Sequence, residues 1–382
     1  MIDYESMAPG VYIEEVTPAG PIAGAGTSTA ALIGTVANPP GAGGLGVPTL
    51  VTNWTQYVTA FGGYKAGLDL PYALWGFFQN GGTRAYVVPI KDASGMPEAL
   101  DGLTREPEVS LVCAPGLTDV TALGTMIKHC EDMRDRFAVL DGVPDDAPLK
   151  ADGDLQKQRA ALKSSSAAYG ALYWPWITIR DPLAPADKPG LVDVPPSGHI
   201  AGVMARSDNR VGVHKAPANE SVRGALDLAY LLNDVEQGAL NHLHINAIRR
   251  FPGGPPVVWG ARTLSEDTAW RFVNVRRLIC YLEDSIIQGV RWAVFAPNNT
   301  TLWKGLERTI SEFLTRVWEA GALFGRTAKE AFYVKIDEEL NPPAVRQAGQ
   351  VFVEIGVQPT GPAEFVVLRF GLWDGGGRIT EG

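Results

Sequence analysis

A glycine-rich run, Gly41-Ala42-Gly43-Gly44-Leu45-Gly46, has the spacing with which some proteins bind a dinucleotide. That fingerprint needs a helix directly after it, because the backbone N–H groups at the helix N-terminus hold the pyrophosphate. Here the next residues, Val47 to Val51, have strand character, and Pro39-Pro40 breaks the tight turn that should lead into a helix. We interpret the run as a loop and not as a nucleotide site.

Histidines offer two further candidates for chemistry. His242 and His244 are two residues apart and would share one face of a strand, as two metal ligands can, but no third ligand is identifiable. His199 lies near Ser197, with Asp208 downstream, yet the G-x-S-x-G turn that presents a hydrolase nucleophile is missing. We therefore predict no catalytic residue, cofactor or metal site, and an α/β enzyme is the least favoured alternative.

The elements that would position such residues are strands alternating with helices over the first two thirds of the chain. The hydrophobic pattern predicts strands at 30–36, 84–90, 109–113, 137–140, 171–179, 244–248 and 257–261. It predicts helices at 119–134, 154–169, 195–206 and 220–235. This alternation is typical of an α/β layer with a largely parallel sheet.

The last third predicts a different arrangement, with two long amphipathic helices followed by β structure. The helices are predicted at 271–288 and 301–323, and the strands at 292–295, 332–336, 350–357 and 365–372. In the second helix six apolar residues form one inward stripe: Leu302, Leu306, Ile310, Phe313, Leu314 and Val317. The fold class that we predict is α/β (α+β).

Composition limits the classes of partner. The 382 residues are enough for two or three domains, and the net charge of −9 argues against a nucleic-acid-binding surface. No run of about 18 apolar residues is present, so we expect no membrane insertion by this subunit. Three scattered cysteines and the lack of a secretory signal predict a protein made in a cytoplasm without a disulfide framework.

The stretch Met7 to Val16, MAPGVYIEEV, contains a short strand without a partner nearby. Val11 and Ile13 alternate with more polar residues, and proline and glycine on both sides leave no hairpin partner within reach. Because the N–H and C=O groups of a strand need partners, it must join either its own sheet or that of another molecule. No Lys or Arg precedes Lys65, so this arm is acidic.

An ordered set of segments resembles one family, the contractile tail sheath proteins of myophages, R-type pyocins and extracellular contractile injection systems. In the C-terminal third these segments are RFVNVRRL (271–278), WAVFAPN (292–298), LW (302–303), FL (313–314), WEAGALFG (318–325), AFYV (331–334) and PAEFVV (362–367). Upstream they are APGVYIEE (8–15), FFQNGG (77–82), RAYVV (84–88), PPSG (195–198), AG (201–202) and APANE (216–220). The resemblance spans nearly the whole chain.

The resemblance implies a structural subunit that forms hexameric rings stacked helically around an inner tube in a metastable array. The array would contract to drive the tube through a target envelope, with baseplate and tail terminator or cap proteins as further partners and no cofactor. The particle, a phage tail or tail-like particle, would be assembled in the bacterial cytoplasm and released outside the cell. The alternative within the family is a terminator or baseplate component that forms a single ring.

The resemblance also implies how subunits connect, through arms that add strands to sheets of neighbouring subunits. It divides the chain into an N-terminal exchange arm (1–20), an α/β body with outward-facing loops (21–260), a tube-facing C-terminal domain (261–360) and a C-terminal exchange arm (361–382). The residues expected in strand exchange are Val11, Tyr12, Ile13, Glu14, Glu15, Phe365, Val366, Val367, Leu368 and Phe370. The tube-facing helix is expected at 301–323, with contacts from Glu307, Glu312 and Glu319.

Overall fold

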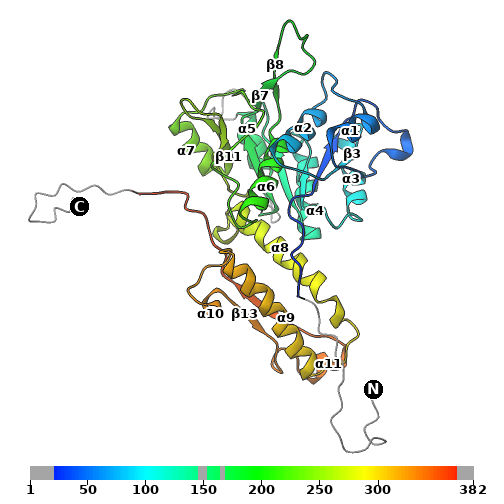
Figure 1. Cartoon of the computed structure of the whole chain (residues 1–382), viewed down its shortest axis with the longest axis vertical. Coiled ribbons are helices and arrows are strands. Elements are labelled where there is room, and N and C mark those ends of the chain that lie inside the picture. Colours follow the sequence, from blue (N-terminus) through cyan, green and yellow to red (C-terminus); the bar gives the residue numbers. More distant parts are fainter. Residues whose placement is uncertain (1–20, 145–152, 164–167, 368–382) are drawn as a thin grey trace, which may run out of the picture.

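The computed structural model describes residues 21–144, 153–163 and 168–367. Figure 1 shows two parts, an α/β body above and a smaller helical and β domain below, which the long helix α8 joins. Helix α8 packs into both parts, since Cys280 belongs to a core of the body and Leu278 and Leu282 belong to the core of the C-terminal domain.

The body is built on a nine-stranded sheet in the order β2-β3-β1-β4-β5-β6-β11-β12-β9. Strands β3, β1, β4, β5, β6 and β11 are parallel, and the remaining strands pair antiparallel at the two edges. Their bounds are Ala30–Gly34 (β1), Thr49–Val51 (β2), Ala85–Pro89 (β3), Leu111–Cys113 (β4), Phe137–Asp141 (β5), Gly170–Trp174 (β6), Glu220–Ser221 (β9), Ile245–Arg250 (β11) and Pro256–Val258 (β12).

Helices cover both faces of this sheet, which is why the central strands are apolar at nearly every position. One face packs on α1 (Trp54–Phe61), α2 (Leu70–Asn80) and α6 (Ser197–Arg210). The other face packs on α3 (Met96–Leu103), α4 (Val120–Met133), α5 (Asp154–Ala161) and α7 (Asp234–His242). In β1, for example, Leu32 belongs to the first core and Ala31 and Ile33 belong to the second.

A second, three-stranded sheet extends from the body at the end opposite the C-terminal domain (Figure 1). It contains β7 (Ile177–Arg180), β8 (Leu191–Val194) and β10 (Asp227–Leu228), all antiparallel. The C-terminal domain consists of α8 (Val273–Gly289), α9 (Thr300–Glu319), α10 (Ala328–Ala331), β13 (Phe332–Lys335), α11 (Pro343–Gln347) and β14 (Glu354–Val357).

The structure confirms the predicted α/β body and most of its elements. Several predicted elements differ from the structure. The strand predicted at 171–179 is divided between β6 and β7, which lie in different sheets. Residues 220–235 do not form one helix, because β9 and β10 pair with strands on different sheets before α7 begins. The helix predicted at 154–169 ends at Ala161. Residues 292–295 are not a strand, because the chain forms a 3-10 turn at Arg291–Ala293 and Phe295 has a positive φ of 66°.

Candidate functional site

The two-stranded sheet β13–β14 is the feature of the C-terminal domain that most needs a partner. Phe332 pairs with Val357 and Lys335 with Glu354, and in the described part of the chain neither strand has a second neighbour. Two strands alone are at best marginally stable in water, and an unpaired edge is a template for another chain. Both outer edges of this sheet are therefore available for added strands.

The position of this sheet is fixed by packing on one of its faces and by the hydrogen bonds of a buried asparagine side chain. Phe332, Val334 and Ile355 pack against the core that α8 and α9 share. Asn341, which is fully buried, accepts a hydrogen bond from the Phe352 N–H at 2.7 Å and donates to the Phe352 carbonyl at 2.9 Å. The approach to β14 is thus fixed before any partner arrives.

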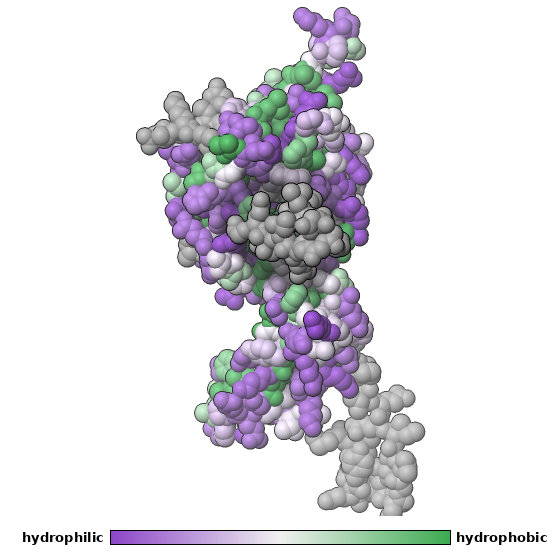
Figure 2. All heavy atoms as spheres, turned by 90° about the vertical axis from the view of Figure 1, so that its left-hand side faces the viewer, coloured by the Kyte–Doolittle hydropathy of each residue, from purple (hydrophilic) through white to green (hydrophobic). Residues whose placement is uncertain are grey.

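The other face of the sheet is exposed and partly aromatic. Tyr333 and Phe352 are about half exposed, and the Tyr333 hydroxyl donates to Glu354 at 2.5 Å. Gly356 lies under the Tyr333 ring, where an added Cβ would come within 2.1 Å of it. Figure 2 shows apolar surface gathered on the lower domain beside hydrophilic surface. Such exposed apolar groups are typical of a surface that contacts another molecule.

Helix α9 covers the inner face of this sheet and carries charge outward. Asn299 caps its N-terminus by accepting from the Leu302 N–H at 3.0 Å. All six residues of the predicted inward stripe are buried, which confirms that part of the prediction. The helix ends at Glu319, four residues earlier than predicted, because Gly321 turns the chain with a φ of +83°.

The three glutamates predicted on this helix, Glu307, Glu312 and Glu319, are all exposed. Lys304 and Arg308 lie on the same exposed side, and Arg308 approaches Glu312 at 4.0 Å, so the outward row carries charges of both signs.

The first described residues run along α8 and α9 before they enter the body at β1. Ile22 is buried among the two helices, and its carbonyl accepts from Arg316 at 2.7 Å. Further along, the Ala25 N–H donates to Ser285 at 2.9 Å. The segment leading to the predicted N-terminal arm is therefore fastened to the C-terminal domain (Figure 1). The five predicted exchange residues of that arm, 11–15, lie outside the described residues.

The joint between body and C-terminal domain contains a buried ion pair. Arg277 of α8 pairs with Asp208 of α6 through contacts of 2.6 and 3.1 Å, and each side chain is only 3% exposed. Arg277 also donates to the Thr27 carbonyl at 2.9 Å. Arg276 lies between the rings of Trp270 and Tyr169. These contacts fix α8 relative to the body.

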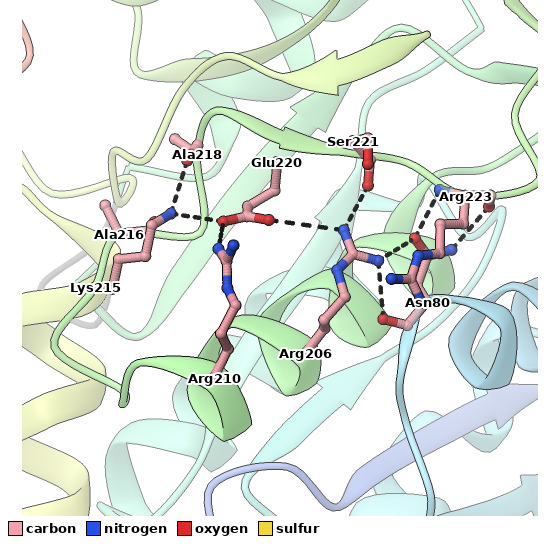
Figure 3. A network of polar contacts seen from close by, with 9 residues as sticks. All are labelled: Asn80, Arg206, Arg210, Lys215, Ala216, Ala218, Glu220, Ser221 and Arg223. Carbon is pink, nitrogen blue, oxygen red and sulfur yellow. Dashed lines mark hydrogen bonds and ion pairs between the residues drawn. The ribbon is translucent and has the colours of Figure 1, made fainter.

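A second polar network, which sequence reasoning missed, ties the end of α6 to its surroundings (Figure 3). Glu220 is buried and faces three cations: Arg210, Lys215 at 3.0 Å and Arg206 at 3.9 Å. Arg206 also donates to the backbone and side-chain oxygens of Asn80 at 3.0 and 3.1 Å. Glu220 is the last residue of the segment APANE (216–220), and its place in that segment is the sequence feature that could have identified it as a functional candidate.

The residues considered for enzymatic chemistry are not brought together. Ser197 donates to Asp141 at 2.7 Å, whereas both ring nitrogens of the buried His199 lack a hydrogen-bond partner among the described residues. Burial lowers the pKa of His199 to about 3. Asp208 is committed to Arg277, as described above. His242 and His244 do not share one face of a strand as expected, because His242 is the last residue of α7 and β11 begins only after His244.

The glycine-rich run forms a short 3-10 helix, Ala42–Gly44, and then leads into strand β2, so no helix N-terminus follows it. Burial raises the pKa of Asp141 to about 7, although Ser197 and Gly116 donate hydrogen bonds to it. Among the described residues, no group of three or more His, Cys, Asp and Glu side chains could hold a metal ion. No helix in the described ranges is long and apolar enough to cross a membrane.

The end of the described chain, Phe365–Val367, is not in a strand, and its side chains are 73–77% exposed. Leu368 and Phe370, also predicted in strand exchange, lie outside the described residues.

Comparison with known proteins places these features in one family. The model of the phage tail sheath protein central domain matches residues 92–264, and that of the phage tail sheath C-terminal domain matches residues 265–372. A Pseudomonas aeruginosa (strain UCBPP-PA14) protein described as a prophage major tail sheath protein is 26% identical over 290 residues, covering 74% of this chain and 70% of that protein.

Two solved structures resemble nearly the whole chain. A chain in the baseplate of the anti-feeding prophage is 30% identical with a TM-score of 0.76, and the match covers 96% of this chain and 99% of that one. A chain in the contracted PVC sheath complex of an extracellular contractile injection system is 28% identical with a TM-score of 0.79, covering 96% and 97%. This chain therefore belongs to the phage tail sheath family and is a structural subunit of a contractile sheath.

Proposed function

We propose that copies of this chain form hexameric rings, stack helically around an inner tube and drive that tube through a target envelope when the array contracts. The solved relatives support this assignment, since they include a contracted sheath and a baseplate assembly. A baseplate, an inner tube protein and a terminator or cap are the further partners that this role requires.

The observation that carries the proposal is the two-stranded sheet β13–β14 with both outer edges unpaired in the described residues. An extended segment that adds to such an edge gains a row of main-chain hydrogen bonds, and its alternate side chains meet the sheet faces. The chain has a short apolar stretch at each end that suits this role. Residues 11–15 would supply a strand to one neighbour, and residues 365–370 would supply a strand to another.

Connection through arms explains how neighbours remain linked while their bodies reorient. Each arm would act as a hinge, since proline and glycine flank the first one at Pro9-Gly10 and Thr17 to Pro21, and Gly375 to Gly377 follow the second. A head-to-tail contact that does not close into a ring generates an open helical array. The free energy for contraction would come from contacts that form on contraction, so the cycle needs no nucleotide.

Deletion of Met1 to Pro18 tests arm exchange directly. The deleted residues lie outside the described core, so we expect a soluble, folded subunit that forms no long tubes in electron micrographs. Replacing residues 1–18 with a Gly-Ser segment of equal length is the matched control for chain length, and it should fail in the same way. Long tubes from either variant would show that the N-terminal strand is not exchanged.

The exposed row of α9 is our candidate for the tube contact. Exposed charge pairs contribute about 0–1 kcal/mol each and are screened by salt, so many weak copies could hold a tube and still release it. Changing Glu307, Glu312 and Glu319 together to Lys should give folded subunits and sheaths that are tube-free or prematurely contracted.

A matched control for that triple variant places the same charge change on the body. Glu98 and Asp101 are exposed on α3, and Asp187 is exposed in the β7–β8 hairpin, at the end of the molecule opposite the C-terminal domain (Figure 1). Their change to Lys should leave extended, tube-filled particles. Extended particles from the α9 variant, with the same yield as the control, would assign the tube contact to another surface.

Expression of the chain alone distinguishes a sheath from a single-ring terminator or baseplate component. Filaments with a helical repeat support the sheath, whereas stable rings that never stack would support the terminator.

A further inference from the structure

The last described segment of the chain is fixed to the α/β body by one ion pair. Glu364 accepts two hydrogen bonds from Arg262, from Nε at 2.8 Å and from Nη2 at 2.5 Å. The two side chains are only 22% and 12% exposed, so the pair is largely shielded from water. A planar guanidinium that holds both carboxylate oxygens fixes direction as well as distance.

Arg262 is itself held in place by the body. Its backbone N–H donates to Asn246 Oδ1 at 2.6 Å, and its carbonyl accepts from Asn246 Nδ2 at 2.7 Å. Asn246 is buried in strand β11. The free arm of the guanidinium donates to the Asn241 carbonyl at the end of α7, at 2.9 Å. The arginine therefore presents a rigid receptor for one carboxylate.

The chain on either side of Glu364 shows where the fixed part ends. Upstream, the Thr360 N–H donates to the Ala322 carbonyl at 3.0 Å, and Asn274 Nδ2 donates to the Thr360 carbonyl at 3.1 Å. Downstream, Phe365 is 73% exposed. A hollow of about 480 Å³ lies between this segment and the body, lined by Trp259 and Phe272 among others. Glu364 is thus the last anchored residue before the exposed one.

We infer that the Arg262–Glu364 pair anchors the C-terminal arm. Through this pair, a force that a neighbouring subunit exerts on the arm is transmitted to the sheet of the α/β body. The segment that follows β14 is held by the C-terminal domain at Thr360, yet its last contact before the exposed residues is with Arg262, which β11 and α7 hold in place. A neighbour that holds the arm would therefore move the body first. Glu364 acts as a positioning residue, because it sets the point and direction from which the arm leaves. This inference rests on the proposed arm exchange.

The test measures anchoring and assembly separately in the full-length chain. Spin labels at Ala363→Cys and at Val235→Cys, both exposed, report the distance between arm root and α7, and the three native cysteines are buried. Glu364→Gln keeps the shape but turns one acceptor into a donor that faces the guanidinium. Glu364→Asp keeps the charge but shortens the reach. Glu266→Gln, which breaks the exposed Lys163–Glu266 pair, is the matched control.

We expect a narrow distance distribution for the parent and for Glu266→Gln, a broad one for Glu364→Gln and an intermediate one for Glu364→Asp. The detached fraction of arm roots should rise about tenfold or more in Glu364→Gln, because a charge-assisted bidentate contact is lost. The yield of long sheaths should fall in the same order. An unchanged distribution in Glu364→Gln would overturn the anchor.

Removal of residues 365–382, which include the whole proposed exchange strand, separates this inference from the function on which it rests. If the truncated chain forms no sheaths while Glu364→Gln broadens the distribution and forms normal sheaths, the anchor carries no load and the inference is wrong, although arm exchange stands. If the truncated chain forms normal sheaths, arm exchange through the C-terminus fails, and the load-bearing role fails with it.

Discussion

The buried pair between Arg277 and Asp208 gives the sharpest prediction about the stability of the joint. Change of Asp208 to Asn removes the charge that compensates a guanidinium only 3% exposed to water. Breaking a buried pair by removing one partner destabilises a fold by about 3–5 kcal/mol, mainly because the other charge stays buried and unpaired. We expect Asp208→Asn to lower the free energy of unfolding by that amount, as measured by urea denaturation of the unassembled subunit.

A double variant separates the lost attraction from the unpaired charge. Replacing both residues by apolar ones, Asp208→Leu with Arg277→Met, removes the buried charge entirely, and such replacements are often close to neutral. The Thr27 carbonyl then loses its donor, which costs about 1–3 kcal/mol. The double variant should therefore be more stable than Asp208→Asn. Asp132→Asn, in an exposed pair with Lys128, is the control and should leave stability unchanged. A loss below about 1 kcal/mol in Asp208→Asn would refute the reasoning.

Three further predictions concern other parts of the chain. Burial lowers the pKa of His199 from its ordinary value of 6.5 to about 3. Between pH 6.5 and 3 the unfolded chain therefore binds a proton that the folded chain does not, so the free energy of unfolding is highest above pH 6.5 and falls as the pH is lowered toward 3. The free energy of unfolding of His199→Leu relative to the parent should therefore rise by about 1.4 kcal/mol per pH unit below 6.5, and parallel pH profiles would contradict this. Asn341→Leu should cost about 1–3 kcal/mol, because two buried backbone groups lose their partner, and thermal melts check it. Val11→Pro or Ile13→Pro should leave the circular dichroism of the subunit unchanged and reduce sheath yield, because proline removes a ladder N–H; a drop in subunit stability above about 2 kcal/mol would place the strand in its own domain.

Periodicity predicted the elements whose residues are buried in a simple repeat. The stripe of α9 is an example, since apolar residues at a 3.6-residue repeat from Leu302 to Val317 lie on one face of a helix. The parallel strands were also predictable, because their near-continuous apolar runs suit a sheet covered on both faces.

The wrong predictions fall where tertiary pairing overrides local pattern. Residues 220–235 contain apolar positions at helical spacing, yet Ser221 pairs with β12 and Leu228 pairs with β7, which belong to two different sheets. No local signal reports which distant strand will supply the partner. The Arg262–Glu364 and Arg277–Asp208 pairs were hidden for the same reason, since their partners are 102 and 69 residues apart. When two charged residues are far apart in the sequence, the sequence alone does not indicate that they form an ion pair in the folded protein.

The hairpin β7–β8 lies at the end of the molecule opposite the C-terminal domain (Figure 1), and its loop is closed at the base. Arg180 pairs with Leu191, and the Asp181 N–H donates to the Gly190 carbonyl at 3.0 Å, so the two ends of the loop are held together. Lengthening a closed surface loop adds little free-energy penalty, because closure entropy grows only slowly with length. A peptide inserted after Pro185 would be displayed once per subunit, which makes this hairpin a place to graft binding epitopes onto a repeating scaffold.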